Sequence, residues 1–225
     1  MLSSEILPEC ANVYLPQHDS RLLIEVMRRC CHPAAMRVAD LCTGSGVAAI
    51  AAADAGADTV VAFDISQAAV AAARANARLV GVPIDARLGS WSAAKGLAPF
   101  DLVLCNPPYV PEPAKREPVI VGAGGPPASF NAGPDGRLIL DPLCATAPAL
   151  LRRGGTALIV QSEFADVASS VTALRDGGLQ ADVVARRTIG FGPVMNARAR
   201  WLEDTGRLTP GRRTEELAVI RAVKP

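Results

Sequence analysis

The amino-acid sequence predicts an α/β fold: a mostly parallel sheet of seven strands with one antiparallel edge strand and helices on both faces. From residue 37 onward, short apolar runs alternate with longer alanine-rich stretches, which is typical of βαβ units with right-handed crossovers. Residues 100–105 form an apolar run, as expected for a strand buried on both faces. The last two apolar runs have no helix as long as the earlier ones between them, which favours an antiparallel edge.

The elements follow in order along the chain. Residues 37–42 (RVADLC) form the first strand, and the turn after it leads into a helix over 47–55. The β-branched run 59–64 (TVVAFD) is the second strand. Ser66 caps the next helix, which ends near residue 80 before Gly81. The remaining strands are expected at 84–88, 100–105, 156–161, 181–189 and 217–223, and the remaining helices at 137–152 and 164–175.

The length of 225 residues indicates a single domain. Residues 37–225 carry the alternating pattern. Residues 1–36 precede the first strand, and their apolar residues 22, 23, 26 and 27 fall at helical spacing, so this part is expected to be an N-terminal helical extension.

Charge and cysteine content exclude several functional classes. The net charge of +1 argues against a protein that grips long nucleic acids, which usually carries a basic stripe. No Cys-x-x-Cys pair is present and there are only two histidines, so no metal site is expected. Residues 1–10 are acidic and broken by Pro8, unlike a secretory signal, and no apolar run reaches membrane-spanning length. We therefore expect a soluble, cytoplasmic protein with no membrane contact.

A long segment rich in proline and glycine, residues 111–136, interrupts the alternation. Its composition forbids a long regular element, and loops above about 12–15 residues are usually functional or disordered. We favour a mobile lid or a substrate-docking loop over simple disorder.

Acidic residues and glycines gather at the ends of the first two strands. Ligands of open parallel sheets bind at this edge, and Gly44 and Gly46 let the backbone approach a ligand closely. Asp64 can accept hydrogen bonds from both ribose hydroxyls of an adenosine-containing cofactor, and Asp40 can accept from an amino group. A dinucleotide site is the alternative, but the Gly-x-Gly-x-x-Gly spacing is absent.

The fourth strand leads directly into Asn106-Pro107-Pro108-Tyr109. The two prolines supply no N–H donors and keep the corner extended, so its carbonyls are free acceptors. The Asn106 side-chain oxygen and the Pro107 carbonyl can hold both hydrogens of an –NH₂ group, and Tyr109 can lie against the planar group that carries it. Orienting a delocalised nitrogen in this way suits methyl transfer by positioning and electrostatics.

These residues resemble the HemK/PrmC family of class I methyltransferases, which have a Rossmann-like fold and modify the glutamine of the Gly-Gly-Gln motif in peptide-chain release factors. Residues 13–20 (VYLPQHDS) are similar to the N-terminal motif of the short, archaeal and eukaryotic-type branch, and Asp135-Gly136 and residues 193–202 (PVMNARARWL) resemble later segments. The resemblance implies S-adenosylmethionine as cofactor, a release factor as substrate and a small activating partner protein. The long bacterial branch carries an N-terminal helical domain for which 36 residues leave no room.

The resemblance also implies which residues perform each role, and the sequence departs from the family pattern at two of them. Cys42 stands where the family usually has glycine, and Ser90 stands where it has the adenine-facing aspartate. The expected catalytic residues are Asn106, Pro107 and Tyr109, and the expected substrate-binding residues are Asn106, Pro107, Pro108 and Tyr109. The expected cofactor-binding residues are Ser20, Asp40, Cys42, Gly44, Gly46, Asp64, Ile65, Ser90, Trp91 and Asn106.

Two alternatives remain beside glutamine methylation. A nucleic-acid methyltransferase can use the same corner for the exocyclic amino group of adenine or guanine. A non-catalytic binding module that kept the fold and lost the cofactor is suggested by Cys42 and Ser90.

Overall fold

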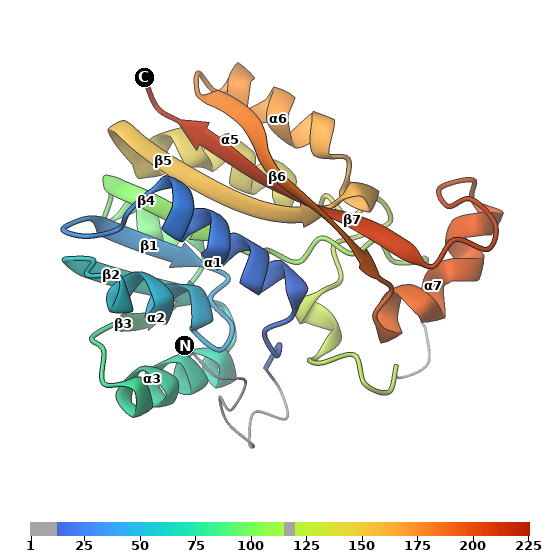
Figure 1. Cartoon of the computed structure of the whole chain (residues 1–225), viewed down its shortest axis with the longest axis horizontal. Helices are drawn as coiled ribbons and strands as arrows, with labels where there is room; N and C mark the ends of the chain where they lie inside the picture. The colour runs from blue at the N-terminus through green and yellow to red at the C-terminus, as the bar shows by residue number, and fades with distance from the viewer. Residues whose placement is uncertain (1–12, 115–119) are drawn as a thin grey trace.

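The computed structural model describes residues 13–114 and 120–225, and residues 1–12 of the expected extension lie outside these ranges. A seven-stranded sheet runs through the molecule in the order β3-β2-β1-β4-β5-β7-β6 (Figure 1). Its strands are β1 Arg37–Leu41, β2 Thr59–Asp64, β3 Asp85–Leu88, β4 Phe100–Cys105, β5 Leu151–Ser162, β6 Gln180–Gly190 and β7 Thr214–Val223. The helices are α1 His18–Cys30, α2 Val47–Asp54, α3 Gln67–Val80, α4 Trp91–Lys95, α5 Leu140–Leu150, α6 Val167–Asp176 and α7 Pro193–Asp204, with short 3₁₀ helices at Pro127–Ser129 and Glu163–Ala165.

The first five strands are parallel, and β7 runs antiparallel to both of its neighbours, β5 and β6. The antiparallel strand therefore lies one place inside the edge, and β6 forms the edge itself. The chain winds from β1 outward to β3 and then returns to β4 on the other side of β1. This reversal between β1 and β4 is the switch point at which open sheets bind ligands.

Two helices differ from the sequence-based expectation. A helix does separate the last two strands: α7 has 12 residues, longer than the 8 of α2, and Pro193 in its first turn suits a helix start. The expected helix over 137–152 was too long at both ends. It is limited to α5, because Leu151 already pairs with Phe100 as the first residue of β5 and the Arg137 side chain bonds across to α6 and the turn before it.

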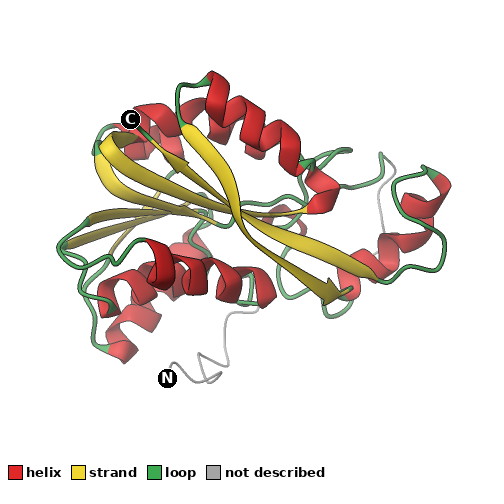
Figure 2. Ribbon diagram, turned by 45° about the horizontal axis from the view of Figure 1, so that its top comes forward, coloured by secondary structure: helices red, strands yellow, loops and turns green. Residues whose placement is uncertain are grey.

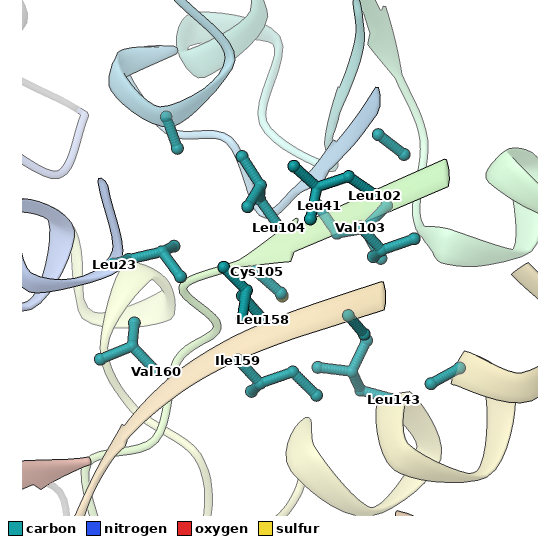
Figure 3. Packing of buried hydrophobic residues seen from close by; sticks show 14 of the residues in the cluster. Leu23, Leu41, Leu102, Val103, Leu104, Cys105, Leu143, Leu158, Ile159 and Val160 are labelled. Carbon is teal, nitrogen blue, oxygen red and sulfur yellow. The ribbon is translucent and has the colours of Figure 1, made fainter. Parts of the chain in front are cut away.

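Helices cover both faces of the sheet, with α1, α2 and α3 on one side and α5 and α6 on the other (Figure 2). The core between them is aliphatic, and Leu41, Leu102, Leu104 and Ile159 from the central strands are almost fully buried (Figure 3). The helical spacing noted for residues 22–27 is confirmed, since Leu22, Leu23, Val26 and Met27 of α1 all face this core. No helix within the described ranges is long and apolar enough to cross a membrane.

The glycine turn after β1 is set by backbone conformation and by a close contact between helices. Gly46 precedes α2 with φ +83°, and a Cβ placed on it would lie 2.8 Å from the Cβ of Ala73 on α3. Its role in this structure is thus to let α2 and α3 approach each other. Gly81 at the C-terminus of α3 has a similar φ of +79° but no atom within 4 Å of such a Cβ.

We predict that Gly46→Ala is more destabilising than Gly81→Ala. Both variants must hold alanine in the left-handed region, at a cost of about 1–2 kcal/mol. Gly46→Ala adds an overpacking cost of roughly 1–3 kcal/mol, because Ala73 belongs to a packed helix. Urea denaturation of the three proteins measures the difference, and equal losses of unfolding free energy would contradict the packing role of Gly46.

Candidate functional site

A cavity of about 200 Å³ opens at the carboxyl ends of β1, β2 and β4, at the switch point of the sheet. Most of the residues that the sequence marked as cofactor-binding are brought together around it. Those that line the cavity are Ser20, Asp40, Cys42, Gly44, Asp64, Ile65, Ser90, Trp91 and Asn106. Gly46 is not among the lining residues, and it packs against Ala73 of α3, as described above. Its predicted contact with the cofactor stays a prediction.

The two acids at the strand ends build the floor of the cavity. Asp64 accepts the N–H of Gly44 at 2.9 Å and the N–H of Ser66 at 2.8 Å, one on each carboxylate oxygen. Asp40 accepts the Thr43 hydroxyl at 2.6 Å and the N–H of Ala49 at 3.1 Å, both on Oδ2. These bonds hold the turn between β1 and α2, and each carboxylate still has lone pairs for a ligand.

Asp40 is 2% exposed, and no cation lies among its hydrogen-bond partners within the described ranges. Burial raises the pKa of its carboxyl to about 7, although the bonds from Thr43 and Ala49 lower it, and the nearby Asp64 charge raises it further. Its Oδ1 accepts no hydrogen bond from the residues that the structure describes. The open oxygen of Asp40 therefore favours a ligand group that is cationic and donates hydrogen bonds.

Cys42, which departs from the family pattern, has φ +57° and lines the cavity. This left-handed conformation costs a residue with a Cβ about 1–2 kcal/mol and explains on physical grounds why glycine suits the position. Ser90 is the N-cap of α4, where its Oγ accepts the N–H of Ser92 at 3.2 Å. Its hydroxyl proton remains available to a ligand in the cavity.

Directly after the end of β4, Asn106 lines the same cavity. Its Nδ2 donates to the Ser20 Oγ at 3.2 Å, and Ser20 in turn bonds Asp19 through its N–H at 2.6 Å and its hydroxyl at 3.3 Å. The amide is thereby oriented with Oδ1 as its open acceptor, since no described donor reaches that atom. Neither does any described N–H donate to the carbonyl of Pro107, which is buried.

Asp19 was not among the predicted site residues, yet it joins the parts of the site. Its Oδ2 accepts the hydroxyls of Tyr14 and Tyr109, each at 3.0 Å. Burial and the Asp19 charge raise the pKa of both tyrosines well above the usual range, so the hydroxyls keep their protons. Tyr109 is thus fixed by its hydroxyl, and it lies outside the first cavity, whereas Pro108 lines it. Its predicted contact with the substrate stays a prediction.

The proline- and glycine-rich segment supplies one wall of the cavity through Pro126, Ala128 and Ser129. It is held against the N-terminal motif: the N–H of Leu15 donates to the Gly124 carbonyl at 2.8 Å, and a Cβ on Gly125 would lie 3.0 Å from the Cα of Tyr14. In the sequence, only the unusual length of this segment indicated that it contributes to the site. Its expected mobility is not tested.

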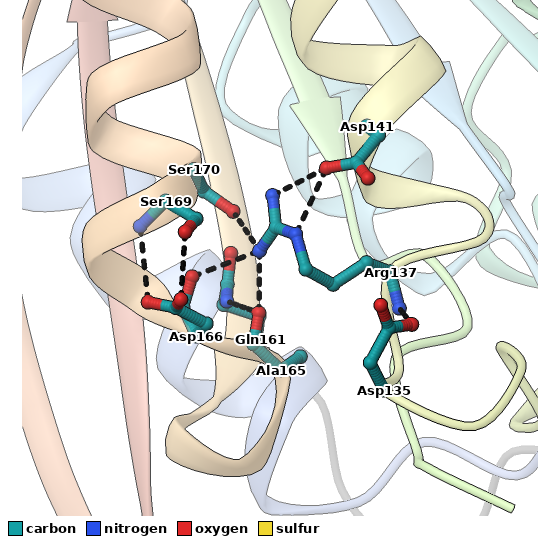
Figure 4. Close-up of polar contacts among 8 residues, drawn as sticks. All are labelled: Asp135, Arg137, Asp141, Gln161, Ala165, Asp166, Ser169 and Ser170. Carbon is teal, nitrogen blue, oxygen red and sulfur yellow. Dashed lines mark hydrogen bonds and ion pairs between the residues drawn. The ribbon is translucent and has the colours of Figure 1, made fainter.

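The C-terminal end of the proline- and glycine-rich segment packs against the corner formed by Asn106–Tyr109. Gly136 packs against the backbone carbonyl of Tyr109 so closely that a Cβ would overlap with it. The next residue, Arg137, is buried and donates to Asp141, to the carbonyls of Ala165 and Asp166, and to the Ser170 hydroxyl (Figure 4). This network holds the Asp135-Gly136 turn against α6. Because Gly136 packs on the Tyr109 carbonyl, the network also helps to position Tyr109, the last residue of the Asn106–Tyr109 corner.

Comparison with known proteins agrees with this geometry. The profile of the family "Methyltransferase small domain" matches residues 17–121. The chain is 32% identical over 185 residues to a putative protein N5-glutamine methyltransferase of Methanocaldococcus jannaschii, covering 81% of this chain and 89% of the relative. It is 33% identical over 183 residues to the release factor glutamine methyltransferase of Mycolicibacterium smegmatis, covering 79% of this chain and 63% of that relative. The chain thus spans less than two thirds of the bacterial protein.

Among solved structures, a chain of the E. cuniculi Mtq2–Trm112 complex matches with a TM-score of 0.63 and 20% identity, over 95% of this chain and 99% of that one. That complex is described as responsible for methylation of the eRF1 translation termination factor. At this level of identity the likeness concerns the fold, and it confirms the predicted Rossmann-like class I methyltransferase architecture.

We predict that Asp40→Asn stabilises the ligand-free protein at alkaline pH. The folded-state pKa of about 7 lies above the ordinary value of 3.8, so the stability linked to this carboxyl is full below pH 4 and is lost as the pH rises through 7. Asparagine keeps the hydrogen bonds of the neutral form. The Tm advantage of the variant should grow between about pH 4 and 7 to several degrees and then level off, with the exposed Asp176→Asn as control. A Tm advantage that is independent of pH would contradict the raised pKa of Asp40.

Proposed function

Because the chain belongs to the HemK/PrmC family of methyltransferases, we propose that it transfers a methyl group from S-adenosylmethionine to the side-chain amide nitrogen of a glutamine in a peptide-chain release factor. The observation that carries this proposal is the oriented Asn106 amide, which lines the first cavity and whose Oδ1 accepts no hydrogen bond from the described residues. The carbonyl of the next residue, Pro107, receives no N–H from the described residues either, although Pro107 is not among the residues that line the cavity. Two acceptors at one corner match the two hydrogens of a primary amide.

The residues around the first cavity fit S-adenosylmethionine. The open oxygen of Asp40 can accept from the ammonium group of its methionine part, and Asp64 retains lone pairs for the ribose hydroxyls. Ile65 follows β2 with 73% of its surface exposed and lines the cavity, so it offers an apolar face to the adenine. When bound, this cofactor supplies an electrophilic methyl group on a sulfonium centre.

The contribution of the chain itself is positioning. An amide nitrogen shares its lone pair with the carbonyl group and is a poor nucleophile. Acceptors at Asn106 and Pro107 fix both N–H bonds, direct the nitrogen at the methyl group and favour its loss of planarity as the new N–C bond forms. Asn106 is neutral, so it takes no proton before the transfer. The proton leaves the nitrogen for water after the methyl group has arrived.

A small partner protein is the second part of the proposal. β3 is an edge strand, so one row of its backbone groups pairs with no strand of the described residues. Leu88 on β3 is 60% exposed, and Leu79 on the adjacent α3 is 69% exposed. An open edge with exposed apolar neighbours is a surface that suits β-strand addition by another chain.

The decisive experiment incubates the protein with methyl-labelled S-adenosylmethionine and purified release factors, alone and with co-expressed partner candidates. We expect label on the glutamine of the Gly-Gly-Gln motif. Asn106→Ala should lower the transfer rate by at least about a hundredfold, as loss of a key electrostatic contact does, while cofactor affinity stays largely unchanged. The exposed Asn196→Ala on α7 serves as a matched control.

Two outcomes would refute the proposal at different points. Label found only in nucleic acid would make the enzyme a base methyltransferase, whereas full activity of Asn106→Ala would remove this residue from the mechanism. Activity of the chain alone would show that no partner is needed.

Cofactor binding can be tested without any substrate. At roughly one hundred times its Kd, a ligand that binds only the folded state stabilises by about 2.7 kcal/mol, or roughly 5–10 °C in Tm for a chain of this size. We expect such a shift with S-adenosylmethionine and a much smaller one in Asp40→Asn, which lacks the negative charge. No shift in the wild-type protein at saturating concentration would favour a non-catalytic module.

A further inference from the structure

A second cavity, of about 250 Å³, lies on the other side of the tyrosine pair from the first. It is bounded by the N-terminal motif, the corner after β4, the end of β6, the start of α7 and the start of β7. Tyr14 lines both cavities, and Asp19 and Tyr109 line the second. Asp19 connects this space to the Asn106–Ser20 contact, because it bonds both tyrosines and Ser20.

The second cavity contains an acid whose charge is not balanced. Glu215 on β7 is 6% exposed and accepts the Ser162 hydroxyl at 2.5 Å through Oε2. Its Oε1 accepts no hydrogen bond from any residue that the structure describes. A carboxylate that is more than nine-tenths buried and has an open oxygen facing a cavity is expensive unless a donor fills it.

The charges around Glu215 are mostly negative. Burial raises the pKa of its carboxyl to about 7, the charges of Asp19 and Glu163 raise it further, and the Ser162 bond and the Arg212 charge lower it. Arg212 is paired with Glu163, so it does not neutralise Glu215. Among the described residues, no arginine or lysine lines the cavity, and its basic residue is His18, at the start of α1.

The wall also contains four aromatic side chains among aliphatic ones. Tyr14, Tyr109, Phe130 and Phe191 all line the cavity. Phe130 already packs under the Arg198 guanidinium, 5.7 Å from its ring centroid, whereas Phe191 meets Phe164 edge to face. Aromatic faces beside two carboxylates attract planar cations.

We propose that this second cavity binds a guanidinium group, namely an arginine side chain of the methyl-acceptor protein, with the open oxygen of Glu215 as its hydrogen-bonding partner and with the charge of Asp19, whose oxygens are already bonded, nearby. The arginine identity rests on the proposed function, because a protein acceptor is what would present such a side chain beside the glutamine. A guanidinium fits better than an ammonium group, since it is planar, weakly hydrated and able to bond two oxygens at once. Its arrival would also place a donor next to Asp19, which holds Ser20 and thus Asn106.

The first test uses the cation alone, so it does not depend on methyl transfer. The chain has only two tyrosines, and both line the second cavity. With ¹³C-labelled tyrosine, titration of methylguanidinium chloride at constant ionic strength should shift both ring signals in a saturable way. The neutral isostere methylurea should not shift them, and methylammonium should bind more weakly.

Matched variants assign the effect to Glu215. Glu215→Gln keeps an acceptor for the Ser162 hydroxyl and removes the charge, so it should fold and lose the methylguanidinium response. Glu216→Gln removes the same charge from the next residue, which points to the other face of β7, and should retain the response. Equal shifts with methylurea, or an undiminished response in Glu215→Gln, would overturn the proposal.

The second test places the cation in a substrate. Gly-Gly-Gln peptides with one arginine at successive flanking positions are compared with the same peptides carrying neutral citrulline. At one position we expect arginine to lower KM by about tenfold, the gain of a good charged contact, with kcat little changed and the gain absent in Glu215→Gln. Methylation of every peptide with no preference would refute the arginine site and leave glutamine methylation standing. If no peptide is methylated, either by the chain alone or with the co-expressed partner candidates, the proposed function fails, and the methylguanidinium titration still decides whether the cavity takes a cation.

Discussion

The carboxylate of Asp19 accepts four hydrogen bonds, from the hydroxyls of Tyr14 and Tyr109 and from the N–H and hydroxyl of Ser20. Taking such a charge out of water costs several kcal/mol unless donors replace the lost hydration. Here the replacement is nearly complete and comes from three places in the chain. The N-terminal motif, α1 and the corner after β4 therefore have to come together for any of them to be stable. The positions of Tyr109 and Asn106 follow from this one group.

Two other buried acids, unlike Asp19, have too few hydrogen-bond donors among the described residues to replace their lost hydration. Asp40 and Glu215 each keep an oxygen without a described donor, and burial raises the pKa of both to about 7. A fold selected for stability alone would pair them or replace them. Each sits on the wall of a cavity, so this cost is most simply understood as part of binding: the site is built for groups that bring positive charge or N–H donors with them. Asp19 lines the second cavity as well, but its four hydrogen bonds already satisfy it, so it differs from Asp40 and Glu215.

The sequence was informative wherever function depends on local geometry. Asp40, Asp64 and Asn106 stand at strand ends, and strand ends are visible as apolar runs, so their convergence followed from the parallel order of the sheet. Asp19 lies in the motif of residues 13–20 that the sequence marked, yet its role could not be found in this way, since it bonds Tyr109 across 90 residues of sequence. The same holds for the second cavity, where Glu215 on the last strand meets residues of the first helix. The cofactor contact of Gly46 stays a prediction, and its packing against Ala73 was not foreseen, because a glycine in a ligand-binding turn and a glycine between two helices look the same in a sequence. The start of β5 was missed because leucine and arginine at 151–152 suit a helix as well as a strand.

Cys42 and Ser90 are informative because the sequence marked them as departures and the structure shows what each costs. Cys42 holds a left-handed φ, yet the turn that contains it is intact: the N–H of Thr43 reaches the Phe63 carbonyl at 3.0 Å and the N–H of Gly44 reaches Asp64. The strain of roughly 1–2 kcal/mol is thus absorbed by the contacts between β1 and β2, and the change affects the surface of the cavity more than its frame. Ser90 still caps α4, so the backbone that presents it keeps its place. In both cases the strands that carry the acids stay in register. The two departures therefore change side chains on the wall of the cavity and leave the backbone that positions Asp40 and Asp64 in place.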